Sequence, residues 1–132
     1  MDFDKYTERA KGFVQAAQTL AQRRGHQQIT PEHLLKTLID DKEGLAANLI
    51  RAAGGEPKTV LAASEAALDK LPRVEGTGAG QLYLAPQTAR LFEEAEKVAE
   101  KAGDSFVTVE RLLLAMTLLK DSPAAKALAQ AG

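Results

Sequence analysis

The chain contains no cysteine, and this absence excludes several kinds of site. Without thiols it has no disulfide framework and no thiol chemistry, which fits the reducing cytoplasm, the location we expect. Histidine is almost as scarce. The only two, His26 and His33, are not spaced as a helical pair of metal ligands, and no clear acidic partner completes a site. We therefore predict no catalytic residue, metal or cofactor in this domain, and expect solvated or capping histidines.

Charge of one sign and long apolar runs are also lacking. The formal net charge is −1, so no basic field favours nucleic acid and no strong acidic field favours a basic partner. No segment is long enough to cross a bilayer, and the charged start Met1–Lys5 has no apolar run behind it, unlike a signal peptide. We expect no nucleic-acid or membrane partner, and a monomeric isolated domain.

Aromatic residues make up only 5% of the chain, whereas alanine and leucine are abundant. No stretch shows the period-two alternation of a strand, so the composition predicts an all-α fold. Apolar residues at spacings of three and four, bounded by threonine, proline and glycine, predict seven helices. They cover residues 3–24, 31–39, 45–53, 57–71, 86–102, 109–119 and 124–131.

One pattern occurs twice in the sequence. Gly25–Leu35 and Gly103–Leu113 each end a helix at glycine and begin the next at Thr-x-Glu. A shift of 78 positions superimposes them without a gap, and the same shift matches core-facing residues such as Ala17 and Ala95. A single shift aligns the core-facing residues, the glycines that end the helices and the threonines that cap the next ones. We therefore predict two pseudo-symmetric helical repeats.

The repeat also predicts the domain organisation. Residues 1–132 form a single domain with a first repeat, a glycine-rich flexible connector and a second repeat, at about 3–71, 72–83 and 84–132. An eighth helix, the counterpart of 57–71, would follow Gly132. We expect it to be missing here, so that the second repeat is truncated.

Three other sequence features have simple structural interpretations. The glycine-rich run at 76–80 lacks the Gly-Lys-Ser/Thr ending of a phosphate-binding loop, so a linker is the better interpretation. The carboxylates of Glu93, Glu94 and Glu96 are typical of a solvated helix face. Gly12 lies inside the first predicted helix, and a glycine there suggests close packing of another helix.

The two copies differ at positions that bear on function. The second has Asp104 for His26, Phe106 for Gln28 and Leu114 for Lys36, so it carries surplus apolar groups and a carboxylate at the turn. One reading is deeper burial against the other repeat. The other is an apolar groove for a peptide, and there we place the docking site.

The repeated Gly…(Ile/Val)-Thr-x-Glu-x-Leu-Leu resembles the Clp amino-terminal domain, which precedes the AAA+ ATPase modules of Clp/Hsp100 unfoldases. The segment Leu71-Pro72-Arg73-Val74-Glu75-Gly76 resembles the ClpB, or disaggregase, branch rather than the protease-linked ClpA and ClpC branches. The resemblance covers essentially the whole chain.

This resemblance implies a non-catalytic domain that binds unfolded or aggregated polypeptide weakly. It further implies a hexameric parent protein with ATP in its AAA+ modules, a middle coiled coil and a DnaK-type chaperone as collaborator. Two alternatives stay open. The domain of a ClpA- or ClpC-type unfoldase recruits a folded adaptor, and a stand-alone enzyme needs a pocket with His26 or His33 beside carboxylates.

The resemblance also implies substrate-binding residues. Its polar positions correspond to Thr7, Asp104 and Glu110, and its apolar groove to the region of Leu91, Phe92 and the helix start after Thr108. Arg111 departs from the ClpB branch, where an apolar residue is common, and its charge is expected to change groove preference.

Each implied residue has a simpler reading too. Thr7 and Glu110 suit helix starts, and Asp104 suits a hydrogen bond within its own turn. Leu91 and Phe92 are adjacent on one helix, so we expect only one to face the core.

Overall fold

The structure is a computed structural model that describes residues 3–41, 44–72, 83–118 and 128. Within them it is mostly helical, with six α-helices. The elements in chain order are the 3₁₀ helix η1 (Phe3–Lys5), α1 (Glu8–Arg23), β1 (Gln28–Ile29), α2 (Pro31–Ile39), α3 (Leu45–Ala52), α4 (Pro57–Asp69), β2 (Tyr83–Leu84), α5 (Pro86–Lys101) and α6 (Val109–Leu118). The predicted connector 73–82 and most of the predicted helix 124–131 lie outside the described residues.

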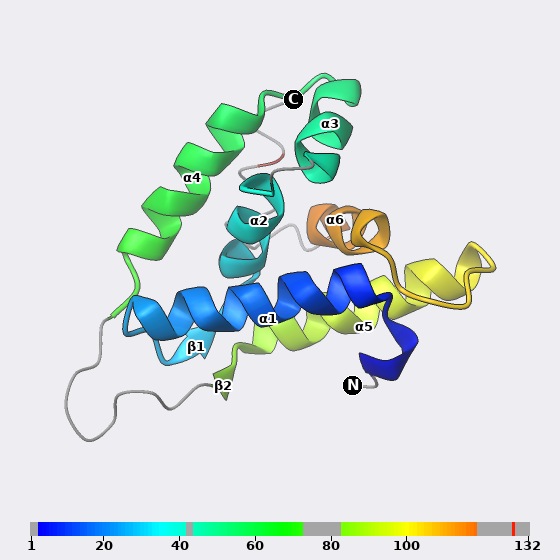
Figure 1. Cartoon of the computed structure of the whole chain (residues 1–132), viewed down its shortest axis with the longest axis horizontal. Coiled ribbons are helices and arrows are strands. Elements are labelled where there is room, and N and C mark those ends of the chain that lie inside the picture. The colour runs from blue at the N-terminus through cyan, green and yellow to red at the C-terminus, as the bar shows by residue number, and fades with distance from the viewer. Residues whose placement is uncertain (1–2, 42–43, 73–82, 119–127, 129–132) are drawn as a thin grey trace.

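Helix α2 is the centre of the fold. It packs between α1 and α4 and also contacts α3, while α5 packs against α6 (Figure 1). The core is built from apolar side chains of these helices, because each presents a stripe at helical spacing, and from Tyr6, which precedes α1. Its largest fully buried members are Tyr6, Leu34, Leu35, Leu38, Val60, Leu68, Leu91, Phe92, Leu112 and Met116.

The predicted turn chemistry is found at several helix ends. Proline occupies the first turn of α2, α4 and α5, where a missing N–H costs nothing. Gly25 and Gly103 follow α1 and α5 with φ of 72° and 76°, a left-handed conformation that favours glycine. These glycines turn the chain sharply into the next helix.

The predicted first helix is wrong at its start. Residues 3–5 form the separate helix η1, and Thr7 caps α1, which begins at Glu8. The break occurs because the chain at Tyr6 forms a parallel bridge with Val107. The Thr7 N–H donates to Val107 O at 3.0 Å, and the Val107 N–H donates to Lys5 O at 2.7 Å. This pairing ties the start of the chain to the α5–α6 turn.

The prediction of no strand also needs correction. Strands β1 and β2 pair in parallel, with Gln28 opposite Tyr83 and Ile29 opposite Leu84. Two-residue strands are too short to show alternation in the sequence. The Ala85 N–H donates to Ile29 O at 3.1 Å. A shift of 78 positions relates this bond to the one from Thr7 to Val107.

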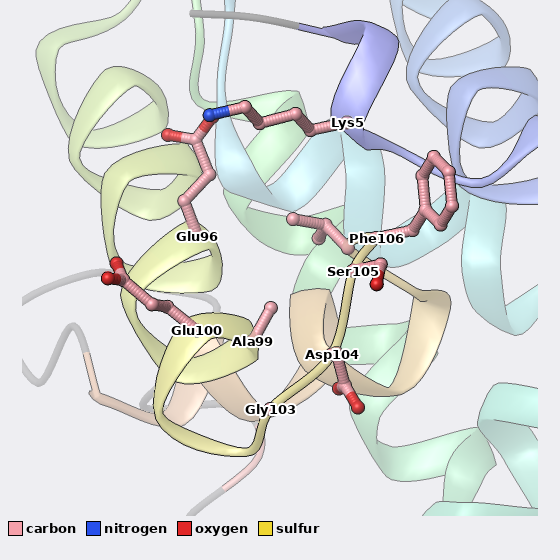
Figure 2. A pocket seen from close by; sticks show the side chains of 9 residues that line it. Lys5, Glu96, Ala99, Glu100, Gly103, Asp104, Ser105 and Phe106 are labelled. Atoms are coloured by element: carbon pink, nitrogen blue, oxygen red, sulfur yellow. The ribbon is translucent and has the colours of Figure 1, made fainter.

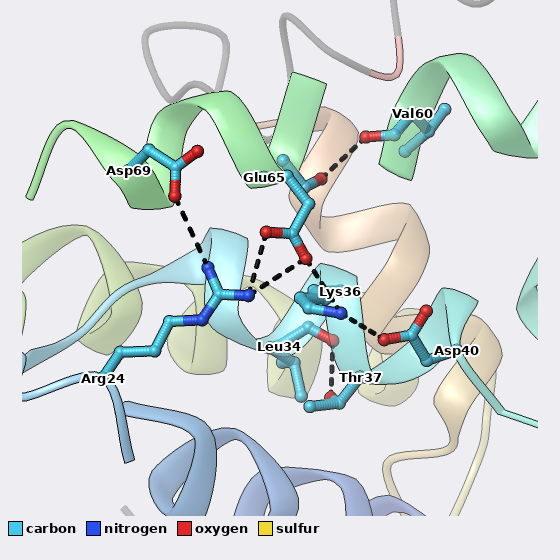
Figure 3. A network of polar contacts seen from close by, with 9 residues as sticks. Arg24, Leu34, Lys36, Thr37, Asp40, Val60, Glu65 and Asp69 are labelled. Atoms are coloured by element: carbon cyan, nitrogen blue, oxygen red, sulfur yellow. Dashed lines mark hydrogen bonds and ion pairs between the residues drawn. The ribbon is translucent and has the colours of Figure 1, made fainter. Parts of the chain in front are cut away.

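An ion-pair network joins α4 to α2 and to the end of α1 (Figure 3). Glu65 accepts from Arg24 Nη2 at 2.9 Å and from Lys36 Nζ at 2.9 Å. Lys36 also pairs with Asp40, and Arg24 Nη1 lies 3.9 Å from Asp69. Burial alone would raise the pKa of Glu65, but hydrogen bonds from Lys36 and Arg24 lower it below its usual value. Arg24 therefore joins the end of α1 to α4.

Candidate docking cleft

A cleft of about 540 Å³ lies where η1, the end of α5 and the α5–α6 turn meet (Figure 2). Two backbone hydrogen bonds shape the turn: Gly103 N–H to Glu100 O at 3.0 Å, and Asp104 N–H to Ala99 O at 2.9 Å. These bonds close the end of α5. The lining residues are Lys5, Glu96, Ala99, Glu100, Gly103, Asp104, Ser105, Phe106 and Val107.

Charged groups form much of the cleft wall. Figure 2 shows the Lys5 amine and the Glu96 carboxylate pointing toward one another, while Asp104 points away from them. Glu100 adds a third carboxylate to the lining. The cleft is thus a polar hollow with acidic excess, beside which one large apolar group is exposed.

That apolar group is Phe106, which is 52% exposed. The pairing of the next residue, Val107, with Tyr6 holds this part of the turn against η1. Phe106 is not among the binding residues that the family resemblance implies, but it is one of the positions at which the two copies differ and where we expect the docking site. The available signal was its replacement of Gln28 between the two copies of the turn. On α6, Leu114 and Leu118 are also exposed, at 42% and 49%.

Asp104 and Arg111 form an ion pair across the turn. Arg111 Nε donates to Asp104 Oδ2 at 2.8 Å, and the Arg111 backbone N–H donates to Thr108 Oγ1 at 3.3 Å. The Asp104 carboxylate therefore reaches beyond its own turn and joins it to α6. The side chains remain 31% and 32% exposed, so both charges are accessible to a ligand.

Thr7 and Glu110 occupy helix starts, as their residue types suggest. Thr7 Oγ1 accepts from the Ala10 N–H at 3.1 Å and caps α1. Glu110 is exposed in the first turn of α6. Thr7 lies two residues from the cleft-lining Lys5, and its backbone bond to Val107 connects it to the cleft turn.

The expectation for Leu91 and Phe92 is wrong: both face the core, with exposures of 0% and 1%. Helix α5 packs against α6 and also contacts α2, so its buried stripe is wide enough for adjacent residues. The Phe92 ring packs edge-on against Tyr6, with centroids 5.9 Å apart. Neither side chain presents a surface to a ligand in this structure.

The two histidines are not solvated. His26 and His33 are 5% and 0% exposed, and His26 Nδ1 lies 2.8 Å from His33 Nε2. His33 does have the expected capping role, because its Nδ1 accepts from the Thr30 N–H at 2.9 Å. Among the described residues there is no group of three or more potential metal-ligating side chains, and no helix long and apolar enough to cross a membrane.

Comparison with known proteins identifies the family. Residues 5–131 match the model of the Clp repeat (R) N-terminal domain. The chaperone protein ClpB of Rhodopseudomonas palustris is 62% identical over 132 residues, which is 100% of this chain and 15% of that protein. This chain therefore spans only a small part of such curated relatives.

Solved structures agree on the fold. The N-terminal domain of the ClpV1 ATPase from E. coli EAEC Sci1 T6SS is 26% identical, with a TM-score of 0.80 over 96% of this chain and 77% of that one. The Hsp104 N-terminal domain from Candida albicans is 23% identical, with a TM-score of 0.81 over 97% of this chain and 82% of that one. The helices, the turn motifs and the family match lead to one conclusion: the chain belongs to the Clp repeat (R) N-terminal domain family.

Proposed function

We propose that this domain is the substrate-docking part of a ClpB-type, ATP-dependent protein disaggregase, and that it catalyses no reaction itself. The family match and the ClpB relatives support the parent activity. The observation that carries the docking role is the cleft beside the exposed ring of Phe106. An exposed aromatic next to a preformed hollow is a typical anchor point for an apolar side chain of an extended polypeptide.

In this proposal the contact surface lies at the α5–α6 turn. Phe106 provides the apolar contact, and the Asp104–Arg111 pair provides exposed groups of both signs for backbone and polar side chains. Thr7 and Glu110 lie at the helix starts beside this turn. Leu91 and Phe92 do not contact the ligand in this proposal; their buried side chains hold α5 in position. An open polar cleft offers limited apolar burial, so we expect weak binding.

Titration of the ¹⁵N-labelled chain with a permanently unfolded model protein tests the docking role. We expect amide shifts at Asp104, Phe106 and Glu110, and a weaker response in Phe106→Ser. The matched control is Tyr83→Ser, because Tyr83 is 58% exposed and lies outside the lining of this cleft. No shifts at millimolar ligand, or equal loss in both variants, would contradict the proposal.

Adaptor binding is the second candidate function. Leu114 and Leu118 are exposed one turn apart on α6, which is the pattern a folded partner recognises on a helix face. A pull-down that recovers one folded protein at a fixed stoichiometry would favour it. Loss of that protein with Leu114→Ser but not Phe106→Ser would separate the α6 face from the cleft.

The remaining features of the parent protein are proposals from similarity. We infer AAA+ modules that bind ATP, assembly into a hexamer, collaboration with a DnaK-type chaperone and a cytoplasmic location. The ClpB relatives support these inferences, because the matched region is only 15% of the relative from Rhodopseudomonas palustris. Sequencing of the parent reading frame tests them by looking for two AAA+ modules and a coiled coil.

We also infer that the fold is a duplicated unit. Helices α1 and α5 have 16 residues each, and the hydrogen bonds from Thr7 to Val107 and from Ala85 to Ile29 exchange places under the shift of 78. Each half thus supplies the pairing partner of the other. A crystal structure tests this inference, because α1–α2 should superimpose on α5–α6 in it.

A further inference from the structure

Two buried imidazoles outside the proposed docking cleft are directly connected. His26 lies in the turn after α1, and His33 lies in the first turn of α2. His26 Nδ1 and His33 Nε2 are 2.8 Å apart, with the ring planes at 64°. At this distance one nitrogen donates and the other accepts, so the tautomers of the two rings are linked.

The backbone of Thr30 fixes both tautomers. Its N–H lies 2.9 Å from His33 Nδ1, and a backbone N–H can only donate. His33 Nδ1 is therefore the acceptor, and the proton of neutral His33 is on Nε2. That proton is donated to His26 Nδ1, so the proton of neutral His26 is on its own Nε2.

An additional proton on either ring breaks one of two hydrogen bonds, the one from His33 to His26 or the one from Thr30 to His33. On His26 Nδ1 it would meet the proton of His33 Nε2, and on His33 Nδ1 it would meet the Thr30 N–H. The Thr30 hydroxyl, 2.9 Å from His33 Nδ1, can accept in the second case. Even then the Thr30 N–H loses its partner, and a buried N–H without a partner is costly.

The consequence reaches the strand pairing, because Thr30 directly follows β1. The carbonyl of Ile29 accepts from the Ala85 N–H at 3.1 Å and from Thr88 Oγ1 at 2.6 Å. Displacement of the Thr30 backbone therefore strains the two bonds that hold β1 to β2 and to the start of α5.

We propose that His26 and His33 form a proton-sensitive latch, closed when both rings are neutral, whose protonation releases β1 from β2 and α5. The latch concerns the α1–α2 turn and does not depend on the docking cleft. It would make the connection between the two halves of the fold weaker in acid, while the Thr7–Val107 connection stays in place.

Charges around the pair set the pH range. Arg24, after α1, is the cation that acts on His33, and Glu65 and Asp69 of α4 pair with it. Helix α2 carries the buried Glu32 and the partly exposed Lys36, β2 carries Tyr83, and α5 carries the uncharged Thr88. Burial, then the charges of His26 and Arg24, lower the pKa of His33 to about 4.

The sign of the effect follows from this lowered value. The closed latch binds a proton less readily than the open one, whose histidine has the ordinary pKa of 6.5. Stability of the closed state is therefore complete above pH 6.5 and is lost as the pH falls toward 4. At pH 5 the equilibrium shifts toward the open state by about twentyfold relative to pH 7.

Histidine ¹⁵N spectra and amide hydrogen exchange of the 132-residue chain test the latch. At pH 7 both rings should show the tautomer protonated at Nε2. Between pH 7 and pH 5 the protection of the Ala85 amide, corrected for intrinsic exchange, should fall about twentyfold. The Thr7 amide, bonded to Val107, is the internal control and should keep its protection.

His33→Gln is the matched variant. It places glutamine three residues after Thr30, the arrangement of a capping box, so the cap is kept without a titrating group. Ala85 protection should then no longer depend on pH over this range. Unchanged Ala85 protection in the original chain, an equal fall in His33→Gln, or a parallel fall at Thr7 would each overturn the latch. The tautomers and the Thr7–Ala85 comparison remain decisive if the variant fails to fold.

Discussion

Asp104 and Arg111 are joined at 2.8 Å at the two positions that correspond, under the shift of 78, to His26 and His33, which are also 2.8 Å apart. Both contacts close the turn between two helices. The first joins a carboxylate to a guanidinium and is partly exposed, whereas the second is buried and depends on proton placement. The same turn geometry is thus stabilised by two different kinds of chemistry.

The exposure of the Asp104–Arg111 pair predicts a small contribution to stability. A double-mutant cycle with Asp104→Asn and Arg111→Met should give a coupling free energy of about 0.5–1 kcal/mol, measured by urea unfolding. The coupling should shrink in high salt, because solvent and ions screen groups that are about one-third exposed. A coupling above about 2 kcal/mol that is insensitive to salt would show that the pair acts as a buried one.

Glu65→Gln should destabilise the fold more than a typical surface change, by about 1–2 kcal/mol. The substitution removes the carboxylate that lies between Arg24 and Lys36, whose side chains are 23% and 16% exposed. The matched control is Glu8→Gln, because the Glu8 side chain is 91% exposed in its pair with Lys11. The control should change the free energy of unfolding by less than about 0.5 kcal/mol.

Glu65 should also make the free energy of unfolding depend on pH. Since the folded-state pKa of Glu65 is lowered, its contribution is present above its ordinary pKa of 4.5 and is lost as the pH falls through the lower folded value. The difference in unfolding free energy between the original chain and Glu65→Gln should therefore narrow below about pH 4.5. A constant difference down to pH 3 would contradict the ion-pair explanation.

Gly12→Ala should stabilise the domain by about 0.5–1 kcal/mol. The sequence suggested close helix packing at Gly12, but a Cβ atom there would meet nothing within 4 Å among the described residues. The residue is exposed inside α1, so alanine adds helix propensity without a clash. Thermal unfolding measures the gain; a loss of stability would indicate that Gly12 is packed against something in solution.

The helices could be predicted from the sequence because each carries its own apolar stripe and end signals. Helix α2 is an example, with Pro31 at its start and buried Leu34, Leu35 and Leu38 at helical spacing. The break between η1 and α1 could not be predicted, since it depends on pairing of Tyr6 with Val107, far along the chain. Local patterns contain no information about such a partner.

The candidate site was predictable only in part, for the same reason. The difference between the two turns pointed to Asp104 and Phe106, but not to which side chains would be exposed. The burial of Leu91 together with Phe92 depends on α5 having neighbours on more than one side. The contact between His26 and His33 depends on the path of the intervening turn, which residue spacing alone does not give.

Phe92 and Phe106 provide the sharpest separation of stability from binding. Phe92→Ala should cost about 3–5 kcal/mol of unfolding free energy, because the ring is 1% exposed and packs against Tyr6. Phe106→Ala should cost less than about 0.5 kcal/mol, because half of its surface is already exposed.

Binding should show the opposite order. At a temperature where both variants are folded, Phe106→Ala should weaken the affinity for an unfolded model protein severalfold. Phe92→Ala should leave it nearly unchanged, because this ring reaches the ligand only through the position of α5. Urea unfolding and NMR titration of the same two samples give both readouts. If Phe92→Ala were the variant that lost binding while remaining folded, the docking surface would have to include the space that opens beneath α5.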